Sequence, residues 1–155
     1  NITTDIKATF DQVTGLDTPS GEMFRLYNAA FARFPDADGL KYWIDEFSSG
    51  RNTRRVVASS FLLSDEFKER YGENVTSEEL VRTMYVNVLG RDIDAETGIP
   101  YNPNGIGLDE IGFNYWVGSL NHEDPSKRET DYEVLLGFSE STENKALFTD
   151  MTGFG

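Results

Sequence analysis

The stretch FPDADGLKYW, residues 34–43, places a proline, two aspartates and two adjacent aromatic residues within ten positions. Pro35 predicts the end of a helix, because proline lacks a backbone N–H and disfavours helical geometry in the residue before it. Asp36 is typical of an N-cap, the residue whose side chain accepts a hydrogen bond from a free N–H of the next helix. The stretch therefore predicts a corner between two helices.

Apolar residues recur at helical spacing on both sides of this corner. After the corner, the spacing is i, i+3, i+4 and i+7: Leu40, Trp43, Ile44 and Phe47. Before the corner, the stripe consists of Met23, Tyr27, Ala30, Phe31 and Phe34. Thr18 and Pro19 precede that stripe and are typical of a helix start. Thr53 and Ser64 are candidate N-caps of two further helices, so residues 19–72 predict a unit of four short helices.

The corner recurs in the second half of the chain. Tyr27, Arg33 and Asp36 recur in the same order and with the same mutual spacing as Tyr85, Arg91 and Asp94. At each corner we expect the arginine to satisfy free carbonyls of the preceding helix and the aspartate to cap the next one. Trp43 recurs as Trp116, but the separation between the two tryptophans is larger than the separation that the other three pairs share. The larger offset predicts an insertion in the second copy, which we place at residues 97–111.

This repetition predicts an all-α fold, a compact bundle of about eight short helices built from an internally duplicated four-helix unit. We expect a single domain over residues 1–155, with an N-terminal helix and lead-in at 1–18, a first repeat at 19–72 and a second repeat at 73–155. Thr76 and Glu79 have the spacing of a capping box at the start of the second repeat. Because the chain begins at Asn1, we expect it to be processed or to be a segment of a longer protein.

The charge of the chain restricts its partners. It has 155 residues, of which 14 are basic and 27 acidic, and a net charge of −13. Nucleic acids and anionic membranes need a basic surface, so neither is an expected partner. No run approaches the roughly 20 apolar residues of a membrane-spanning helix, so no membrane insertion is expected. The absence of cysteine excludes disulfides and zinc–thiolate sites.

The acidic charge is concentrated in the second half. Residues 22–72 carry eight acidic and eight basic side chains, whereas residues 73–155 carry sixteen acidic and five basic ones, a net charge of −11. A cation is therefore expected to bind the second half.

Several motifs together resemble a known family. They are LYNAAFARFPDADGLKYW, VVASSFLLSDEF, MYVNVLGRDIDAETG, GFNYWVGSL and VLLGFSESTE. Over about residues 22–145 they resemble the bacterial domain of unknown function of the 4214 type, which is similar in pattern to phycobilisome linker domains. The resemblance implies an all-helical module of secreted or cell-surface bacterial proteins, often beside calcium-binding repeats, with no agreed enzymatic activity. The insertion departs from the pattern of the 4214-type family, and the acidic charge departs from the phycobilisome linkers. A linker-like assembly role is an alternative.

The stretch RDIDAETGIPYNPNGIGLDE is rich in oxygen-bearing side chains. The candidate calcium ligands are Asp92, Asp94, Glu96, Asn102, Asn104 and Asp109. Calcium takes six to eight oxygen ligands from flexible loops, which favours a calcium site here. The pattern is not an EF-hand, because Thr97 and Pro103 stand where that loop needs glycine and glutamate. A solvated acidic loop with Asn-Pro-Asn-Gly turns is the alternative interpretation.

Aromatic residues near the corners are candidates for ligand contact. Trp43 and Trp116 lie on the apolar stripes of their helices, which predicts that both are core residues. Tyr42 and Tyr115 lie one position round the helix, toward solvent, and with Tyr101 they form the candidate surface for a glycan or protein.

The cluster Arg51, Arg54 and Arg55 is the main basic feature of the sequence. It is interpreted either as the solvated start of a helix or as a surface that binds the acidic half of a neighbouring copy. The second interpretation predicts head-to-tail association.

Catalysis has little support in the sequence. His122 is the only histidine, it lies in the polar stretch NHEDP, and no nucleophile or phosphate-binding motif accompanies it. We therefore expect a non-catalytic interaction or structural module of a bacterial secreted or surface protein, one that mediates protein–protein assembly or attachment and is a candidate for calcium stabilisation. A carbohydrate-binding module is the alternative.

Overall fold

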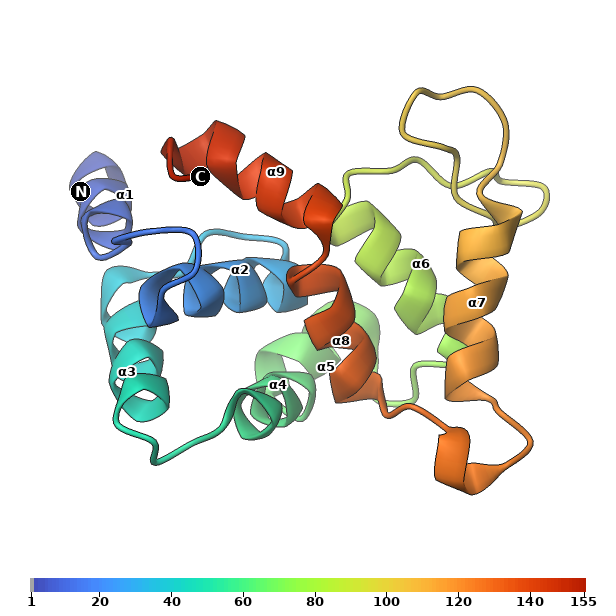
Figure 1. Ribbon diagram of the computed structural model, residues 1–155, viewed down its shortest axis with the longest axis horizontal. Helices are drawn as coiled ribbons and strands as arrows, with labels where there is room; N and C mark the ends of the chain where they lie inside the picture. The colour runs from blue at the N-terminus through green and yellow to red at the C-terminus, as the bar shows by residue number, and fades with distance from the viewer. Residues whose placement is uncertain (1) are drawn as a thin grey trace.

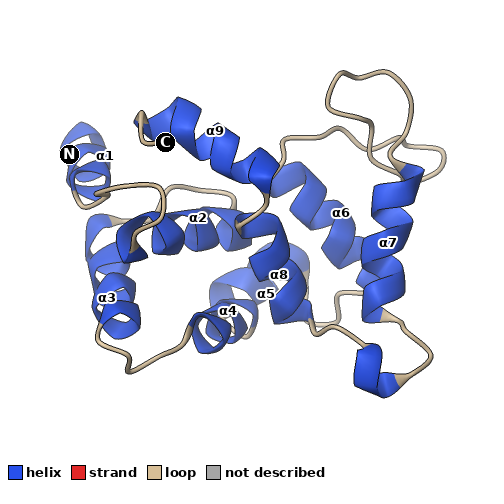
Figure 2. Cartoon of the chain, in the orientation of Figure 1, coloured by secondary structure: helices blue, strands red, loops and turns tan. Residues whose placement is uncertain are grey.

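The computed structural model describes the backbone of residues 2–155 and the side chains from Ile6 onward; Asn1 lies outside the described residues. The helices are α1 (Ile2–Asp11), α2 (Pro19–Phe31), α3 (Ala37–Ser48), α4 (Arg54–Leu62), α5 (Asp65–Tyr71), α6 (Ser77–Asn87), α7 (Glu110–Leu120), the 3-10 turn η1 (Pro125–Lys127), α8 (Asp131–Ser139) and α9 (Thr142–Thr152) (Figure 1). The predicted all-α class is confirmed, since the described residues hold no strand and only two isolated β-bridges (Figure 2). Within residues 2–155, none of the helices is both long enough and apolar enough to cross a membrane.

The helices begin at the polar residues that the sequence predicts. Each of five residues accepts a hydrogen bond from a free backbone N–H at the start of its helix: Thr18, Asp36, Thr53, Ser64 and Thr76. Helix α2 ends at Phe31, earlier than the apolar stripe predicts, because Ala32 adopts a left-handed conformation with φ of 54°. A complete capping box, with bonds in both directions, forms at Thr130 and Glu133 at the start of α8.

The two predicted units correspond to α2–α5 and α6–α9. Helix α2 packs on α3 in the first unit as α6 packs on α7 in the second, and the units join through contacts of α4 with α8 and of α2 with α6 and α8. Figure 1 shows α3 and α7 at opposite ends of the molecule, with α2, α4, α6 and α8 between them.

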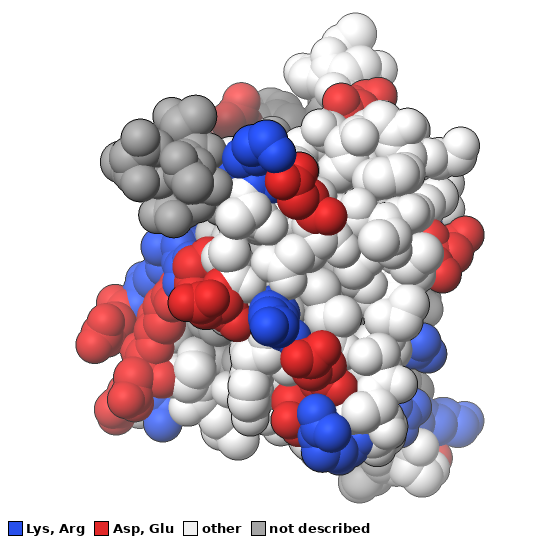
Figure 3. Space-filling view, turned by 90° about the vertical axis from the view of Figure 1, so that its left-hand side faces the viewer, with Lys and Arg blue, Asp and Glu red and all other residues white. Residues whose placement is uncertain are grey.

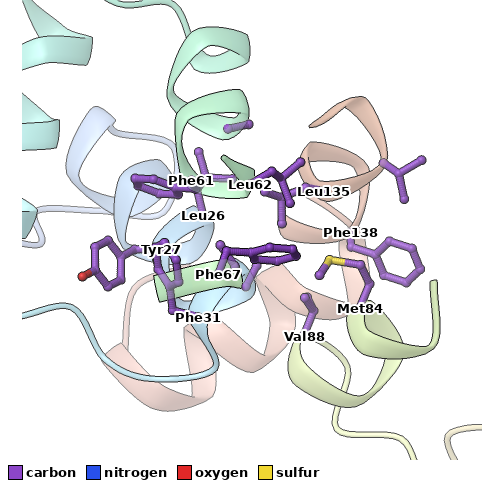
Figure 4. Packing of buried hydrophobic residues seen from close by; sticks show 14 of the residues in the cluster. Leu26, Tyr27, Phe31, Phe61, Leu62, Phe67, Met84, Val88, Leu135 and Phe138 are labelled. Atoms are coloured by element: carbon purple, nitrogen blue, oxygen red, sulfur yellow. The ribbon is translucent and has the colours of Figure 1, made fainter. Parts of the chain in front are cut away.

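Both units contribute to one hydrophobic core (Figure 4). Leu26 and Phe61 come from the first unit, and Met84, Leu135 and Phe138 come from the second. Each of these side chains is no more than 2% exposed. Because the apolar surface of each unit is buried against the other, we expect the two units to unfold together.

An aromatic cluster repeats in the two units. The ring of Phe61 lies 5.4 Å from that of Tyr27 and 5.1 Å from that of Trp43, measured between centroids. In the second unit the ring of Phe138 lies 4.8 Å from that of Trp116. Both tryptophans pack against the core, which confirms their predicted structural role.

Helix α1 covers the first corner. Thr9 Oγ1 donates a hydrogen bond of 2.7 Å to the carbonyl of Pro35, and Gln12 Nε2 donates one of 2.9 Å to the carbonyl of Ala37. The ring of Phe10 packs against Phe34 beside these bonds. The polar backbone of the first corner is therefore shielded by a segment from outside the repeated units.

Arg25 of α2 is a buried charge that no local sequence pattern predicts. It binds both carboxylate oxygens of Glu140, at 3.3 and 2.8 Å, and donates to the carbonyl of Leu16 at 2.7 Å. Its guanidinium also lies over the ring of Phe148 in α9. Glu140 is 115 residues away in the sequence, so no local pattern could reveal this link between α2 and the turn from α8 to α9.

Two glycines predict opposite effects of the same substitution. A Cβ on Gly137 in α8 would lie 2.8 Å from the ring of Trp116, whereas a Cβ on Gly118 in α7 would meet no atom within 4 Å. We expect Gly137→Ala to lower the free energy of unfolding by about 1–3 kcal/mol through overpacking. Gly118→Ala is expected to raise it by about 0.5–1 kcal/mol, because alanine is the better helix former. Urea unfolding of the two variants checks both signs, and a stabilised Gly137→Ala chain would contradict the packing of Trp116.

Candidate functional site

The first corner is built from four polar side chains. Arg33 of the loop after α2 binds both oxygens of Glu66 in α5, at 2.9 and 2.8 Å, and donates to the hydroxyl of Tyr27 at 2.7 Å. Asp36 caps α3 by accepting a hydrogen bond of 3.0 Å from the N–H of Gly39. The main partner of the arginine is thus a carboxylate of a later helix, whereas the sequence analysis assigned it to carbonyls of the preceding helix.

The ion pair at the first corner predicts a loss of stability in acid. Hydrogen bonding from Arg33 holds the pKa of Glu66 below its ordinary value. A lowered pKa stabilises the folded chain above the unfolded pKa of about 4.3, and this contribution is lost as the pH falls through the folded pKa. Between about pH 5 and pH 2 the wild-type chain should therefore lose more stability than a Glu66→Gln variant. Urea unfolding across this range measures the difference, and parallel profiles would show that the pair is not coupled to folding.

The second corner repeats the same arrangement. Arg91 binds both oxygens of Glu143 in α9, at 3.1 and 2.7 Å. Asp109 caps α7 by accepting a hydrogen bond of 3.1 Å from the N–H of Gly112. Tyr85 donates to Asp109 at 3.1 Å, and Arg91 Nη1 lies 3.5 Å from the same carboxylate. Burial and the nearby carboxylate of Asp109 raise the pKa of Tyr85, so this hydroxyl stays protonated as a donor.

The counterpart of Asp36 is therefore Asp109, and the sequence-based match to Asp94 is wrong. The insertion lies between Arg91 and Asp109 and does not extend over residues 97–111, because residues 109–111 cap and begin α7. A pattern in the sequence does predict that Asp109 is the counterpart of Asp36. The pattern D-x-x-G-x-x-Y-W occurs at residues 36–43 and again at 109–116, in register with the two tryptophans.

The insertion is held to the second unit by its own hydrogen bonds. Asp94 accepts bonds from the N–H and hydroxyl of Thr97, at 2.9 and 2.7 Å, and from the hydroxyl of Tyr101 at 3.0 Å. These bonds, led by that from the Thr97 hydroxyl, lower the pKa of Asp94. Arg82 of α6 donates to the carbonyl of Gly98 at 2.8 Å. Two antiparallel bridges complete the framework, and they join residues 93 to 100 and 101 to 108.

A pocket of about 730 Å³ lies between this insertion and α9. Its lining includes Arg91, Asp92, Tyr101, Pro103, Glu143 and Leu147. Arg91 also donates to the carbonyl of Tyr101 at 2.9 Å, so the insertion is fixed to the ion pair beneath it. The side chain of Arg91 is 8% exposed, compared with 35% for Arg33 at the first corner. The insertion therefore buries the second corner and forms a pocket beside it.

Four of the six candidate calcium ligands make hydrogen bonds in or beside the insertion. Asp94 and Asp109 accept the bonds described above, and Asn104 accepts a bond of 3.0 Å from the N–H of Ile106. Asn102 donates its amide to the carbonyl of the same Ile106 at 2.9 Å. Among the described residues no group of three His, Cys, Asp or Glu side chains is placed to hold a metal ion. Calcium binding by this loop therefore stays a prediction.

Calcium titration tests the predicted site directly. Because four of the six candidate ligands, Asp94, Asn102, Asn104 and Asp109, already have hydrogen-bond partners in the protein, we expect the midpoint of thermal unfolding to be the same in calcium and in chelator. Calcium at a hundredfold excess over its Kd would instead add about 2.7 kcal/mol, a shift of several degrees. Such a shift, absent when Asp92 and Asp94 are both changed to Asn, would restore the predicted calcium site.

The three clustered arginines are each paired within the chain. Arg51 lies 3.0 Å from Glu46, Arg54 binds Glu22 at 3.0 and 3.1 Å, and Arg55 lies 3.6 Å from Glu133. Figure 3 shows the face that carries α1 and α3, where acidic and basic side chains lie next to one another. This arrangement leaves less uncompensated positive charge for a neighbouring copy than the sequence alone suggests.

The candidate tyrosines do not form one platform. Tyr42 on α3 and Tyr115 on α7 are exposed, as predicted, but these helices lie at opposite ends of the molecule (Figure 1). Tyr101 is partly buried, and its hydroxyl is bound to Asp94. His122 is partly buried just after the end of α7, and its Nδ1 accepts a bond from the N–H of Asp124.

Comparison with known families agrees with the sequence motifs. A family described as a domain of unknown function (DUF4214) matches the chain over residues 58–101 and 107–148, more than half of its length. The unmatched residues 102–106 between the two segments lie within the insertion. No curated protein and no solved structure matches the chain. The chain therefore belongs to the family defined as the domain of unknown function DUF4214.

Proposed function

We propose that this chain is a non-catalytic protein-interaction module of a bacterial secreted or surface protein. The insertion, with the pocket beside it, is its contact surface. In this proposal the duplicated helical units are the scaffold, and the loop between Arg91 and Asp109 carries the function. Loops fixed on a rigid scaffold are a common location for binding sites.

Exposed apolar side chains carry the proposal. Ile111, at the start of α7, is 88% exposed, and Ile106, in the insertion, is 75% exposed. These are the two most exposed large apolar side chains among the described residues, and both belong to the segment that the first unit lacks or to its immediate border. Contiguous exposed apolar patches rimmed by polar residues are typical of protein contact sites.

The polar groups around the pocket support a binding role over catalysis. Arg91 and Glu143 bind each other, and Asp94 accepts three hydrogen bonds from the loop itself. These bonds hold the fold together. A catalytic acid or base needs access to the reacting group and a pKa matched to its task.

Selection of binding peptides tests the contact surface. A phage library of random peptides would be panned on the immobilised chain, and the enriched clones would be tested on two double variants. Ile106→Ser with Ile111→Ser removes the proposed contact. Leu63→Ser with Val56→Ser is the matched control, because these side chains are also exposed, at 68% and 47%, but lie on the first unit.

The proposal predicts clones that bind the wild-type chain and the control but not the Ile106/Ile111 variant. Clones that bind the Ile106/Ile111 variant as well as wild type would place the contact surface elsewhere. Selected peptides that compete with a sugar would favour the carbohydrate-binding alternative.

A further inference from the structure

We propose that the pocket beside the insertion binds a lysine or arginine side chain of the partner protein. This inference rests on the proposed function of the insertion as a contact surface. It specifies the chemistry of the residue that enters the pocket.

The first corner shows what occupies the equivalent position. Arg70 lies four residues after Glu66 on α5, and its Nε is 3.4 Å from the carboxylate of Glu66. Glu66 thus binds two arginines, Arg33 and Arg70. At the second corner the residue four positions after Glu143 is Leu147, which lines the pocket. The carboxylate of Glu143 binds Arg91 but has no second arginine from its own helix.

The charges around the pocket favour a cation. Glu143 keeps 35% of its side chain exposed while it binds Arg91. Asp92 is exposed at the pocket, and among the described residues its carboxylate accepts no hydrogen bond. The second repeat as a whole carries a net charge of −11. An incoming ammonium or guanidinium group would therefore gain charge-assisted hydrogen bonds.

The walls of the pocket match the stem of a long basic side chain. Leu147 and Pro103 offer apolar surface, and Tyr101 offers an aromatic ring. Lysine and arginine carry apolar methylene groups below a charged head, and the head group is attracted to aromatic rings. An acidic side chain lacks this match, because the guanidinium of Arg91 is already bound to Glu143 and to the carbonyl of Tyr101.

The test uses short capped peptides that differ at one central residue: lysine, arginine or the uncharged norleucine. Binding is followed by two-dimensional amide NMR on the isotope-labelled full chain. We expect the lysine or arginine peptide to shift amides of residues 89–92, 101–105 and 143–147, with an effect that weakens as salt is added. The norleucine peptide should bind at least about threefold more weakly, as expected for the loss of one partly exposed ion pair.

Two variants, each of which adds one arginine to α9, test whether the basic side chain binds in the pocket itself. Leu147→Arg supplies the arginine that the first corner has, so it should fill the pocket and weaken binding by about tenfold, the loss of one good charge-assisted contact. Met151→Arg is the control, because Met151 lies one turn further along α9, is similarly exposed and does not line the pocket. Each variant is checked for a folded amide spectrum before titration.

The outcomes separate this inference from the proposed function. Equal binding of the norleucine peptide, or equal weakening by Leu147→Arg and Met151→Arg, would overturn the cation site and leave the Ile106/Ile111 contact standing. Absence of any shift at the pocket with the basic peptides would also overturn it. Failure of the peptide selection at Ile106 and Ile111, by contrast, would remove the proposed contact surface itself.

Discussion

Replacing Arg91 by alanine is expected to lower the free energy of unfolding by about 3 kcal/mol, whereas Arg33→Ala should cost about 1 kcal/mol. Both arginines bind a glutamate through two hydrogen bonds. Arg91 is only 8% exposed, so its removal leaves Glu143 and the carbonyl of Tyr101 without a donor beneath the insertion. At the first corner, water can supply the hydrogen bonds that are lost when the more exposed Arg33 is removed.

Urea unfolding of the two single variants measures this difference. The slopes of the transitions should match that of the wild-type chain, so that the midpoints report stability alone. A loss at Arg33 that equals or exceeds the loss at Arg91 would mean that the insertion does not shield the second corner.

Replacing Phe138 by alanine is expected to cost about 4 kcal/mol, the typical loss for a buried phenylalanine. Phe138 is 1% exposed, and its ring packs on Tyr85 at 5.1 Å and on Trp116 at 4.8 Å. Because the core is shared, this loss should lower the stability of both units together. Val86→Ala on the exposed face of α6 serves as the control and should change stability by less than about 0.5 kcal/mol.

Tryptophan fluorescence and far-ultraviolet circular dichroism check this prediction during urea unfolding. Trp43 reports on the first unit and Trp116 on the second. Coincident transitions at a lower midpoint are expected in Phe138→Ala. Separate transitions, with the first unit unfolding as in wild type, would contradict the single shared core.

Local features of the fold were predictable from the sequence. Asp36 and Ser64 cap helices through bonds to residues three positions away, and such bonds depend only on residue type and spacing. The burial of Trp43 and Trp116 followed from helical periodicity for the same reason. The repeat itself was visible because both copies keep the same residues at these local positions.

Contacts between distant segments were not predictable. Glu143 follows Ser141 as Glu66 follows Ser64, but its bond to Arg91 spans 52 residues and forms only when α9 folds back on the second corner. The false match of Asp94 to Asp36 arose because an acidic residue stands by coincidence at the same distance after Arg91 as Asp36 does after Arg33. The pocket needs both the insertion and α9, so no single stretch of sequence contains it.

A shortened chain tests most directly whether the second corner is the first corner with a binding loop added. In it, residues 92–108 are replaced by the Phe-Pro link of residues 34–35, so that Arg91 is joined to Asp109 as Arg33 is joined to Asp36. The measurement is urea unfolding of this chain, with and without Arg91→Ala. We predict one cooperative transition and a cost of Arg91→Ala that falls to about 1 kcal/mol, the value expected for an exposed pair. Loss of the cooperative transition would contradict this account, because it would make the insertion an essential part of the second unit.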